Sequence, residues 1–385
     1  MAENVIETDI IKTTGTTVTS VLRSADGEIT EQQVLDALRV VEDPDLHRDI
    51  VTLGFVKDIK ICDGNVAFKV ELTTPACPVK DLLKMQAHDA VAALPGVTQV
   101  AVEMTAQVRG QKRTGQELIP KVRHVIAVAS GKGGVGKSTC AVNLAVALAQ
   151  MGAKVGLMDA DIYGPSLPMM MGVDKKPLLK DTPDGPKMIP VACHGVLMIS
   201  LGFLLDPDKA VIWRGPMVAG TVRQLLADVM WGEQDYLIVD LPPGTGDAPL
   251  TLAQQVPISG VVVVMTPQHV AQEIANKSIQ MFRTVGQGQN RPIPILGVVE
   301  NMSGGVFGSG GGERAAKRLN VPFLGRVPLD PVICEAGDAG QPAILAAPDS
   351  EQAQAFRDIA RTLAAQVSIL QYAHEQSEAG EPPVE

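Results

Sequence analysis

The chain has 385 residues, 45% of them hydrophobic and 20% charged, which is the composition of a globular protein large enough for two or three domains. Its formal net charge of −10 and its 3% aromatic content argue against a nucleic-acid surface and against general binding to anionic membranes. No apolar run approaches the roughly 18 residues of a membrane span, and the five cysteines are scattered, which predicts a cytoplasmic protein without disulfides.

The N-terminal part predicts a polar tail and a small α/β domain. Residues 1–28 are rich in threonine and lack the apolar core of a signal peptide, so we expect a disordered tail. Residues 29–105 combine an amphipathic pattern with short apolar runs, which is typical of helices packed on a small sheet. The expected elements are a helix at 31–41, a hairpin of strands at 56–61 and 66–72, a helix at 77–93 and a strand at 97–104.

Residues 106–122 are polar and basic and are interpreted as a linker between two domains. From 123 to 373 strands alternate with helices, which predicts an α/β domain with a doubly wound, mostly parallel sheet. The last helix carries only two arginines on its polar face, so we expect it to pack on the domain, ahead of an acidic, disordered tail at 374–385. The expected strands are 125–129, 154–158, 196–200, 236–240, 260–265, 294–299 and 322–325, and the last helix is 351–371.

The run SGKGGVGKST at residues 130–139 fits the P-loop pattern, in which glycines let backbone N–H groups approach phosphate oxygens. An apolar strand precedes it and a helix follows, and this order favours a phosphate loop over a chance glycine-rich turn. Lys137 is expected to reach the β- and γ-phosphates of ATP, and Ser138 to ligate Mg²⁺. The expected nucleotide contacts are Gly131, Lys132, Gly133, Gly134, Val135, Gly136, Lys137, Ser138 and Thr139.

Three carboxylates follow two of the expected strands, at the edge where parallel sheets bind ligands. Asp240 ends an apolar strand, which is the Walker B pattern that steadies Mg²⁺. Asp159 and Asp161 follow the strand at 154–158. Asp161 is the better candidate for orienting the attacking water, and a capped loop is the alternative for both aspartates. The loop LPPGTGD at 241–247 is suited to a switch that senses the γ-phosphate.

Six motifs together resemble the Mrp/ApbC family of deviant-Walker ATPases, which carry iron–sulfur clusters to apoproteins. They are KGGVGKST in the P-loop, DADIYGPS (159–166), WRGPM (213–217), DYLIVDLPPGTGD (235–247), TPQ (266–268) and ENMS (300–303), and the match spans roughly residues 122–345. The N-terminal region resembles the small MIP-type domain of iron–sulfur assembly factors through EDPD (42–45), LG (53–54) and TPACP (74–78). The order of the two regions also matches Mrp proteins that carry the small domain ahead of the ATPase.

The resemblance implies a homodimeric ATPase whose hydrolysis is coupled to transfer of a cluster to apoprotein clients, with iron–sulfur assembly factors as further partners. It implies that Lys132 reaches across the dimer to the partner's phosphates, where a cation delivered in trans neutralises transition-state charge. A solvated lysine is the alternative. It also implies that Asn301 hydrogen-bonds the adenine, with residues 327–330 flanking the base. The expected catalytic residues are Lys132, Lys137, Asp161 and Asp240.

The cysteine pair that holds a bridging [4Fe–4S] cluster in many Mrp-type proteins is missing here, because ENMS runs directly into GGVFGSGGG at 304–312. Cys77 is the remaining candidate ligand, since N–H groups and the dipole at the entry to a helix are expected to lower its pKa and favour the thiolate. The alternative is a small buried hydrophobe. Of the other cysteines, Cys140 is expected in the core, Cys62 and Cys193 are incidental, and Cys334 could face the nucleotide pocket; no His/Cys spacing makes a zinc site.

Two other functions remain open beside the leading hypothesis of an iron–sulfur carrier. A positioning or switch ATPase of the MinD/ParA type shares the lysine-bearing loop. It would need a basic amphipathic tail or a DNA-binding patch, which this acidic chain does not show. An ATP-dependent ligase of the dethiobiotin synthetase type shares the fold, but WRGPM and the small N-terminal domain count against it.

Overall fold

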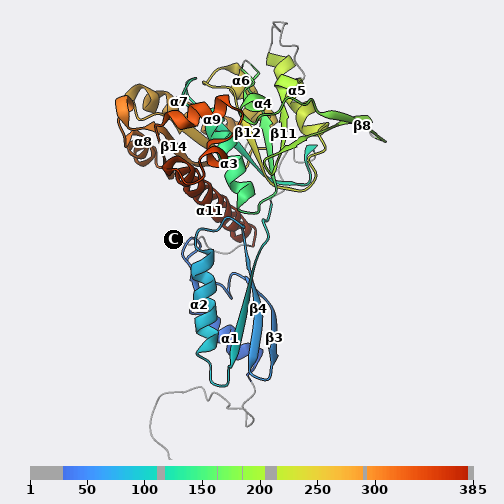
Figure 1. Ribbon diagram of the computed structural model, residues 1–385, viewed down its shortest axis with the longest axis vertical. Coiled ribbons are helices and arrows are strands. Elements are labelled where there is room, and N and C mark those ends of the chain that lie inside the picture. Colours follow the sequence, from blue (N-terminus) through green and yellow to red (C-terminus); the bar gives the residue numbers. More distant parts are fainter. Residues whose placement is uncertain are drawn as a thin grey trace, which may run out of the picture.

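The computed structural model describes residues 29–110, 118–162, 164–183, 185–203, 215–288 and 293–379, which form two domains arranged end to end (Figure 1). The expected tail at 1–28, the middle of the linker at 111–117, Trp213 and Arg214 of WRGPM, and residues 380–385 lie outside this part of the chain. None of the helices in the described ranges has the length and apolar character needed to cross a membrane.

The small N-terminal domain packs two helices on a three-stranded sheet (Figure 1). Its elements are α1 (Glu31–Leu38), the short strands β1 (Glu42–Asp43) and β2 (Arg48–Asp49), β3 (Val56–Cys62), β4 (Asn65–Leu72), α2 (Lys80–Ala92) and β5 (Gln99–Ala106). The sheet order is β3-β4-β5, with β3 antiparallel and β5 parallel to β4. Every second residue of β4 is buried, from Val66 to Leu72, because this face of the pleated strand forms the domain's core.

Local signals in the sequence explain where these elements begin and turn. Thr30 and Gln33 form a capping box that starts α1. Asp63 and Gly64 have φ of 48° and 78°, and two residues of positive φ suit the tight turn of the expected hairpin. Helix α2 begins at Lys80 and not at residue 77. The expected start is wrong because Pro78 disfavours a helical conformation of the residue before it.

The second domain is a doubly wound α/β domain, as the sequence predicts. Its eight strands lie in the order β10-β11-β7-β12-β6-β13-β14-β15, and all neighbours pair in parallel except β10 with β11. The strands are β6 (Val122–Ser130), β7 (Val155–Asp159), β10 (Val191–Cys193), β11 (Val196–Ser200), β12 (Gln234–Asp240), β13 (Gly260–Met265), β14 (Ile295–Ser303) and β15 (Phe323–Pro328). All seven expected strands are present, and the central ones are buried on both faces.

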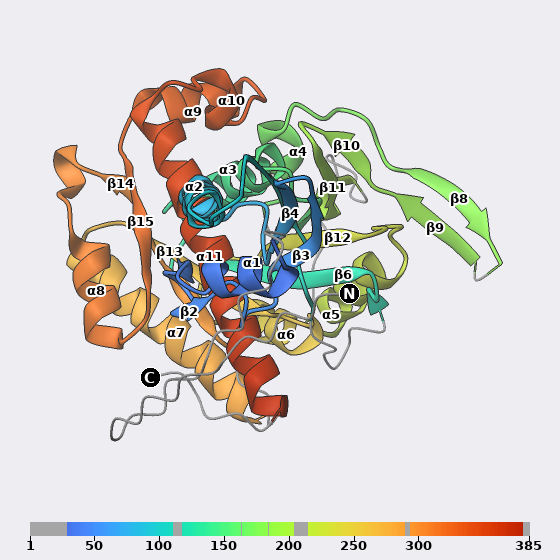
Figure 2. The same ribbon diagram turned by 90° about the horizontal axis from the view of Figure 1, so that it is seen from below.

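Helices cover the faces of this sheet (Figure 2). They are α3 (Lys137–Gln150), α4 (Leu167–Met170), α5 (Gly215–Ala227), α6 (Asp247–Gln255), α7 (His269–Gly288), α8 (Gly311–Leu319), α9 (Pro331–Asp338), α10 (Ala343–Ala346) and α11 (Glu351–Ala379), with short 3₁₀ turns at Leu201–Phe203 and Gly305–Phe307. The central order β7-β12-β6 places Asp159 opposite Asp240 and Asp240 opposite Val128 in the register. The strand ends that lead to the P-loop and to both aspartate loops are therefore neighbours.

An antiparallel hairpin of β8 (Leu178–Thr182) and β9 (Gly185–Ile189) was not expected from the sequence. It projects from the edge of the domain (Figure 2), and the side chains of Leu178 and Leu179 are 71% and 72% exposed. Because lysines, aspartates and prolines interrupt its apolar residues, the segment lacks the alternation that marks a half-buried strand.

Helix α11 runs to Ala379, eight residues beyond its expected end at 371. Residues 374–379 are therefore helical, and placing them in a disordered tail was wrong. This segment contains alanine, glutamate and glutamine but neither glycine nor proline, which suits a continuing helix. The expectation that the helix packs on the domain is confirmed, because Phe356, Leu363 and Val367 lie in the core of the second domain.

Candidate functional site

The P-loop joins the carboxyl end of β6 to the start of α3, as the sequence predicts. Gly134 and Gly136 have φ of 76° and 78°, where residues other than glycine are strained. Gly136 also lies close to β14, since a Cβ built on it would clash with Asn301 Nδ2. Glycine at position 136 is thus required both by the backbone conformation and by the close approach of Asn301.

Four of the predicted site residues meet at one buried point. The Lys137 ammonium donates to Asp240 Oδ1 at 2.6 Å, and the Ser138 hydroxyl donates to Asp240 Oδ2 at 2.5 Å. Asp161 approaches from β7, with its Oδ2 3.6 Å from Lys137 Nζ. Burial raises the pKa of Asp240 above its ordinary value, although the neighbouring ammonium and hydroxyl pull it down. Lys137 and Asp240 therefore form an ion pair in a buried place, where a charge without a partner of opposite sign would be costly.

The oxygen donors around Asp240 fit a Mg²⁺ ion. Hydroxyl and carboxylate oxygens are the hard ligands that this ion prefers. Asp161 adds a further observation, because its Oδ1 is buried and has no hydrogen-bond partner within the described part of the chain. A buried oxygen of this kind is costly unless a water or a cation satisfies it. Ser138, Asp240 and Asp161 are therefore the residues that could hold the ion and its water.

Asp159 holds the loop that carries Asp161. Its Oδ1 accepts a hydrogen bond from the Asp161 N–H at 3.1 Å, and its Oδ2 accepts from the Leu167 N–H at 3.2 Å and the Ser200 hydroxyl at 2.9 Å. Burial, and then the charge of Asp240, raise the pKa of Asp159 to about 7. The capped-loop alternative thus describes the contacts of Asp159, whereas the side chain of Asp161 faces Lys137.

Asn301 lies beside the P-loop, at the end of β14. It is buried, and its Nδ2 donates to the Val135 carbonyl at 2.9 Å. The amide therefore fastens the segment ENMS to the nucleotide loop. Its contact with adenine stays a prediction, as does the place of residues 327–330 beside the base.

Sequence reasoning missed Glu300, which organises the glycine-rich segment at 304–312. Its carboxylate is fully buried and accepts hydrogen bonds from the Ser303 hydroxyl at 2.7 Å and from the Gly310 and Gly312 N–H groups at 2.9 and 2.6 Å. The glycine-rich segment that follows ENMS is thus held in place by hydrogen bonds to the buried carboxylate of Glu300. A glutamate at the end of an apolar strand was the available signal.

Lys132 is half-buried at the tip of the P-loop, next to the exposed Gly133 and Gly134. Its carbonyl accepts from the Ser130 hydroxyl at 3.0 Å, but its ammonium makes no hydrogen bond or ion pair with any residue that the structure describes. The predicted switch loop touches the same turn, since the Gly244 N–H donates to the Ser130 carbonyl at 2.8 Å. The Lys132 cation is therefore available to a ligand or to a second chain.

Cys77 lies in the small domain, and the prediction of a lowered pKa is wrong. The residue precedes α2 and does not enter it, and its half-buried side chain packs against the core of the small domain. Burial raises the pKa of the thiol to about 11, and the carboxylates of Asp43 and Asp45 add to this shift. The thiol is therefore protonated at neutral pH.

The other cysteines form no cluster with it. Cys140 is fully buried in the core, as expected, Cys62 and Cys334 are exposed, and Cys193 is half-buried. Throughout the described ranges, no three His, Cys, Asp or Glu side chains are arranged to hold a metal ion. The described residues therefore contain no preformed set of ligands for a cluster.

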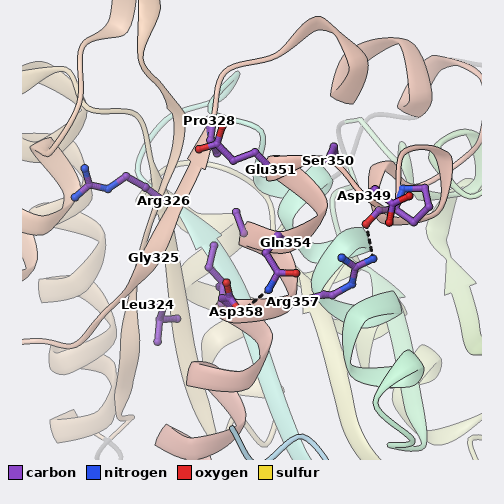
Figure 3. A pocket seen from close by; sticks show the side chains of 13 residues that line it. Leu324, Gly325, Arg326, Pro328, Asp349, Ser350, Glu351, Gln354, Arg357 and Asp358 are labelled. Atoms are coloured by element: carbon purple, nitrogen blue, oxygen red, sulfur yellow. Dashed lines mark hydrogen bonds between the residues drawn. The ribbon is translucent and has the colours of Figure 1, made fainter.

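A separate groove of about 660 Å³ lies between β15 and the start of α11 (Figure 3). Some of its polar side chains already have hydrogen-bond partners within the groove. Arg357 donates to the Pro348 backbone carbonyl at 2.7 Å, and Gln354 donates to the Asp358 carboxylate at 2.9 Å. Apart from Pro328, which belongs to the segment predicted to flank the base, the groove contains none of the predicted site residues, and so the P-loop remains the candidate functional site.

Comparison with known proteins agrees with this architecture. The family described as NUBPL iron-transfer P-loop NTPase matches residues 121–364, and a family described as iron–sulfur cluster assembly protein matches residues 31–103. The chain is 48% identical over 354 residues to an iron–sulfur cluster carrier protein of Synechocystis sp., a match that covers 89% of this chain and 99% of the relative. It is 46% identical over 346 residues to a protein of the same name from Deinococcus radiodurans, covering 87% and 95%.

A solved structure extends the likeness to the fold. A nucleotide-binding protein from Archaeoglobus fulgidus, in complex with ADP, is 34% identical and superposes with a TM-score of 0.53, covering 64% of this chain and 98% of that one. The matched families account for both domains, each in its expected place. The chain therefore belongs to the NUBPL iron-transfer P-loop NTPases and carries an iron–sulfur cluster assembly domain ahead of the NTPase domain.

Proposed function

We propose that this protein is an ATPase that binds iron–sulfur clusters and transfers them to apoproteins. The observation that carries the proposal is the joining, in one chain, of a P-loop site built from Lys137, Ser138 and Asp240 to an iron–sulfur cluster assembly domain. The match covers nearly the whole length of the relatives named as carriers. These relatives therefore share both domains with this chain. A switch ATPase of the MinD/ParA type would account for the P-loop but not for the small domain.

In this proposal ATP is held through its phosphates by the backbone of residues 131–139 and by Lys137. Ser138 and Asp240 would hold Mg²⁺, which would supply positive charge that offsets the charge of the transferring phosphoryl group. Because Lys137 pairs with Asp240 in the structure, the phosphates would draw its ammonium away from that carboxylate. The unpartnered Oδ1 of Asp161 supports a role in orienting the attacking water.

Two subunits are proposed to complete each other's sites. The support within this chain is the unengaged ammonium of Lys132, which lies at an exposed loop tip beside the phosphate-binding turn. A cation that enters from a partner neutralises charge only when the dimer closes, so hydrolysis would depend on closure.

Mixing experiments test this arrangement. Lys132→Ala and Lys137→Ala proteins should each be inactive alone and should recover roughly a quarter of wild-type ATPase activity when mixed, because half of the dimers are mixed and each has one complete site. Lys175→Ala, at an exposed lysine outside the site, should keep full activity and serves as the matched control. Absence of recovery in the mixture, with both variants folded and dimeric, would rule out delivery of Lys132 in trans.

The cargo site is proposed to include Cys77, the cysteine of the small domain's TPACP segment. Binding of iron requires the thiolate, and the pKa of about 11 means that cluster binding must displace a proton. Uptake of a cluster should therefore increase as the pH rises from 7 to 9.

Anaerobic reconstitution with iron and sulfide tests the cargo, with visible absorption and transfer to an apoprotein as readouts. Wild type and Cys193→Ala should take up a cluster, and Cys77→Ala should lose it. Cys193 is a matched control because it is also half-buried and its pKa is also raised to about 11. A wild-type protein that takes up no cluster would refute the carrier function and leave an ATPase of unknown cargo. Retention of the cluster in Cys77→Ala would refute the role of Cys77.

A further inference from the structure

One contact between the small domain and the NTPase domain is made by a short segment, residues 74–77, called here the docking loop. Thr74 Oγ1 and Tyr236 OH lie 3.0 Å apart in a buried hydrogen bond, and the Ala76 N–H donates to the same Thr74 oxygen at 3.2 Å. Ala76 belongs to the hydrophobic core of the NTPase domain. Pro75 faces Gly152, where an added Cβ would lie 4.0 Å from the Pro75 Cβ. The docking loop is thus seated in the other domain.

Both elements that the docking loop touches carry nucleotide-site residues at their opposite ends. Tyr236 lies near the start of β12, and Asp240 is the last residue of this fully buried strand. Gly152 follows the end of α3, and Lys137 is the first residue of that helix. At the nucleotide site the two elements are joined again by the bond between Lys137 and Asp240. A strand and a helix are therefore linked at one end by the P-loop pair and at the other by the docking loop.

A second contact between the domains is made by α11, and it contains a buried polar atom without a hydrogen-bond partner among the described residues. Ile369 and Tyr372 pack on the core of the small domain, and Arg109 Nη1 lies 3.4 Å from Glu375 Oε2. Gln371 has a buried Oε1 without a partner among the described residues. A buried, unpartnered oxygen weakens an interface, and contacts between domains are in general modest in energy. The seated arrangement is thus one that a small change in free energy can release.

We propose that nucleotide binding and the seating of the docking loop are coupled, so that a bound nucleotide loosens the small domain. Phosphates that draw Lys137 away from Asp240 remove the link between α3 and β12 at the nucleotide end. The two elements can then shift against each other where they hold residues 74–77. The docking loop is seated in the same structure in which Lys137 pairs with Asp240. The phosphates of a nucleotide compete with Asp240 for the Lys137 ammonium. The inference rests on the nucleotide binding of the proposed function, but not on its cargo.

Coupling of this kind is reciprocal. Release of the seat must raise the affinity for nucleotide by the same factor by which nucleotide weakens the seat, and a change that weakens the seat raises the affinity by up to that factor. The docking loop ends at Cys77, so the same shift changes the surroundings of the candidate cargo ligand. ATP binding would in this way prepare the small domain to gain or release its cargo.

The test uses the full-length protein, with Mg²⁺ and ATPγS as the probe. Thr74→Val removes the hydroxyl that joins Tyr236, and Tyr236→Phe removes the other partner. Thr98→Val is the matched control, because Thr98 is an exposed residue of the small domain that bonds Asn65 at 3.3 Å, away from the interface. We expect the Kd for ATPγS to fall about threefold in Thr74→Val, to fall less in Tyr236→Phe and to stay unchanged in Thr98→Val.

Amide hydrogen exchange at residues 73–79 is the second readout. In wild type, ATPγS should speed exchange of these amides, and in Thr74→Val the exchange should already be fast without nucleotide. An unchanged Kd in both variants, or slower exchange of the docking loop with nucleotide, overturns the coupling. A wild-type protein that does not bind ATPγS would instead contradict the proposed function. The two failures can therefore be told apart.

Discussion

At the scale of single residues, the nucleotide site depends on how burial and pairing act on its carboxylates. Asp240 is fully buried between Lys137 and Ser138, so its charge is tolerated only while these donors are present. Asp159 lies on the neighbouring strand without a cation of its own, and three donors stabilise its carboxylate. The same sheet edge thus holds two acids whose pKa burial raises, and of the two Asp240 is paired with the Lys137 ammonium.

The raised pKa of Asp159 predicts a dependence of stability on pH. Its value of about 7 lies above the ordinary value of 3.8, so the folded state binds the extra proton between about pH 4 and pH 7. The contribution of Asp159 to the free energy of unfolding should therefore fall, by a few kcal/mol at most, as the pH rises through this range, and stay constant above it.

Asp159→Asn isolates this effect, because its lost hydrogen bonds shift stability equally at every pH. Denaturant unfolding of both proteins, measured without nucleotide, should show wild type losing stability relative to the variant between pH 5 and pH 7. A difference that stays flat across this range would show that Asp159 is ionised in the folded protein.

At the scale of elements, the site is made where β14 presents Asn301 to the P-loop. Glu300 closes the glycine-rich segment that follows β14, and Asn301 donates to the Val135 carbonyl. The close approach is possible because Gly136 has no side chain. The P-loop and the end of β14, which are far apart in the sequence, therefore form one wall of the site.

Gly136→Ala should damage this wall. The added Cβ would clash with Asn301 Nδ2, and the alanine would be strained at the φ of 78° that the fold requires. We therefore expect a loss of about 2 kcal/mol in the free energy of unfolding and loss of nucleotide binding. Gly133→Ala is the control for stability, since the nearest atom to its Cβ is 3.9 Å away and its backbone is unstrained. Denaturant unfolding without nucleotide gives the comparison, and equal stability of the two variants would contradict the close contact.

At the scale of the whole molecule, α11 joins two hydrophobic cores. Leu363 and Val367 lie in the core of the NTPase domain, and Ile369 and Tyr372 pack on that of the small domain. Arg48 lies over the Tyr372 ring at 5.9 Å from its centroid, a distance suited to a cation–π contact. One helix thus sets the position of the small domain against the NTPase domain.

Tyr372→Ala should free the small domain while leaving the NTPase core folded. The lost ring contact should cost about 1–3 kcal/mol of domain association, and proteolysis between the domains should become faster. Leu370→Ala is the matched control, because Leu370 lies on the same helix with a side chain that is 37% exposed. Limited proteolysis with mass spectrometry gives the measurement, and equal cleavage of the two variants would show that Tyr372 does not hold the domains together.

Much of the fold could be predicted because its signals are local. The strands of the parallel sheet are continuous apolar runs, and the P-loop places its donors in ten successive residues. The projecting hairpin at Leu178 and Leu179 could not, because it does not bury one face and so leaves no periodic pattern. Nor could the role of Glu300, whose partners become neighbours only after β14 and α8 pack.

The sequence by itself determined the phosphate loop, the order of strands and helices, the carboxylates at their ends and the absence of a cysteine pair after ENMS. These follow from spacing along the chain, because the bonding groups are contiguous or lie at successive strand ends. Only the tertiary structure decided that Asp161 and not Asp159 faces Lys137, that burial raises the pKa of Cys77, and that Thr74 is bonded to Tyr236. Direction, burial and contact between distant segments arise from packing, and no local pattern records them.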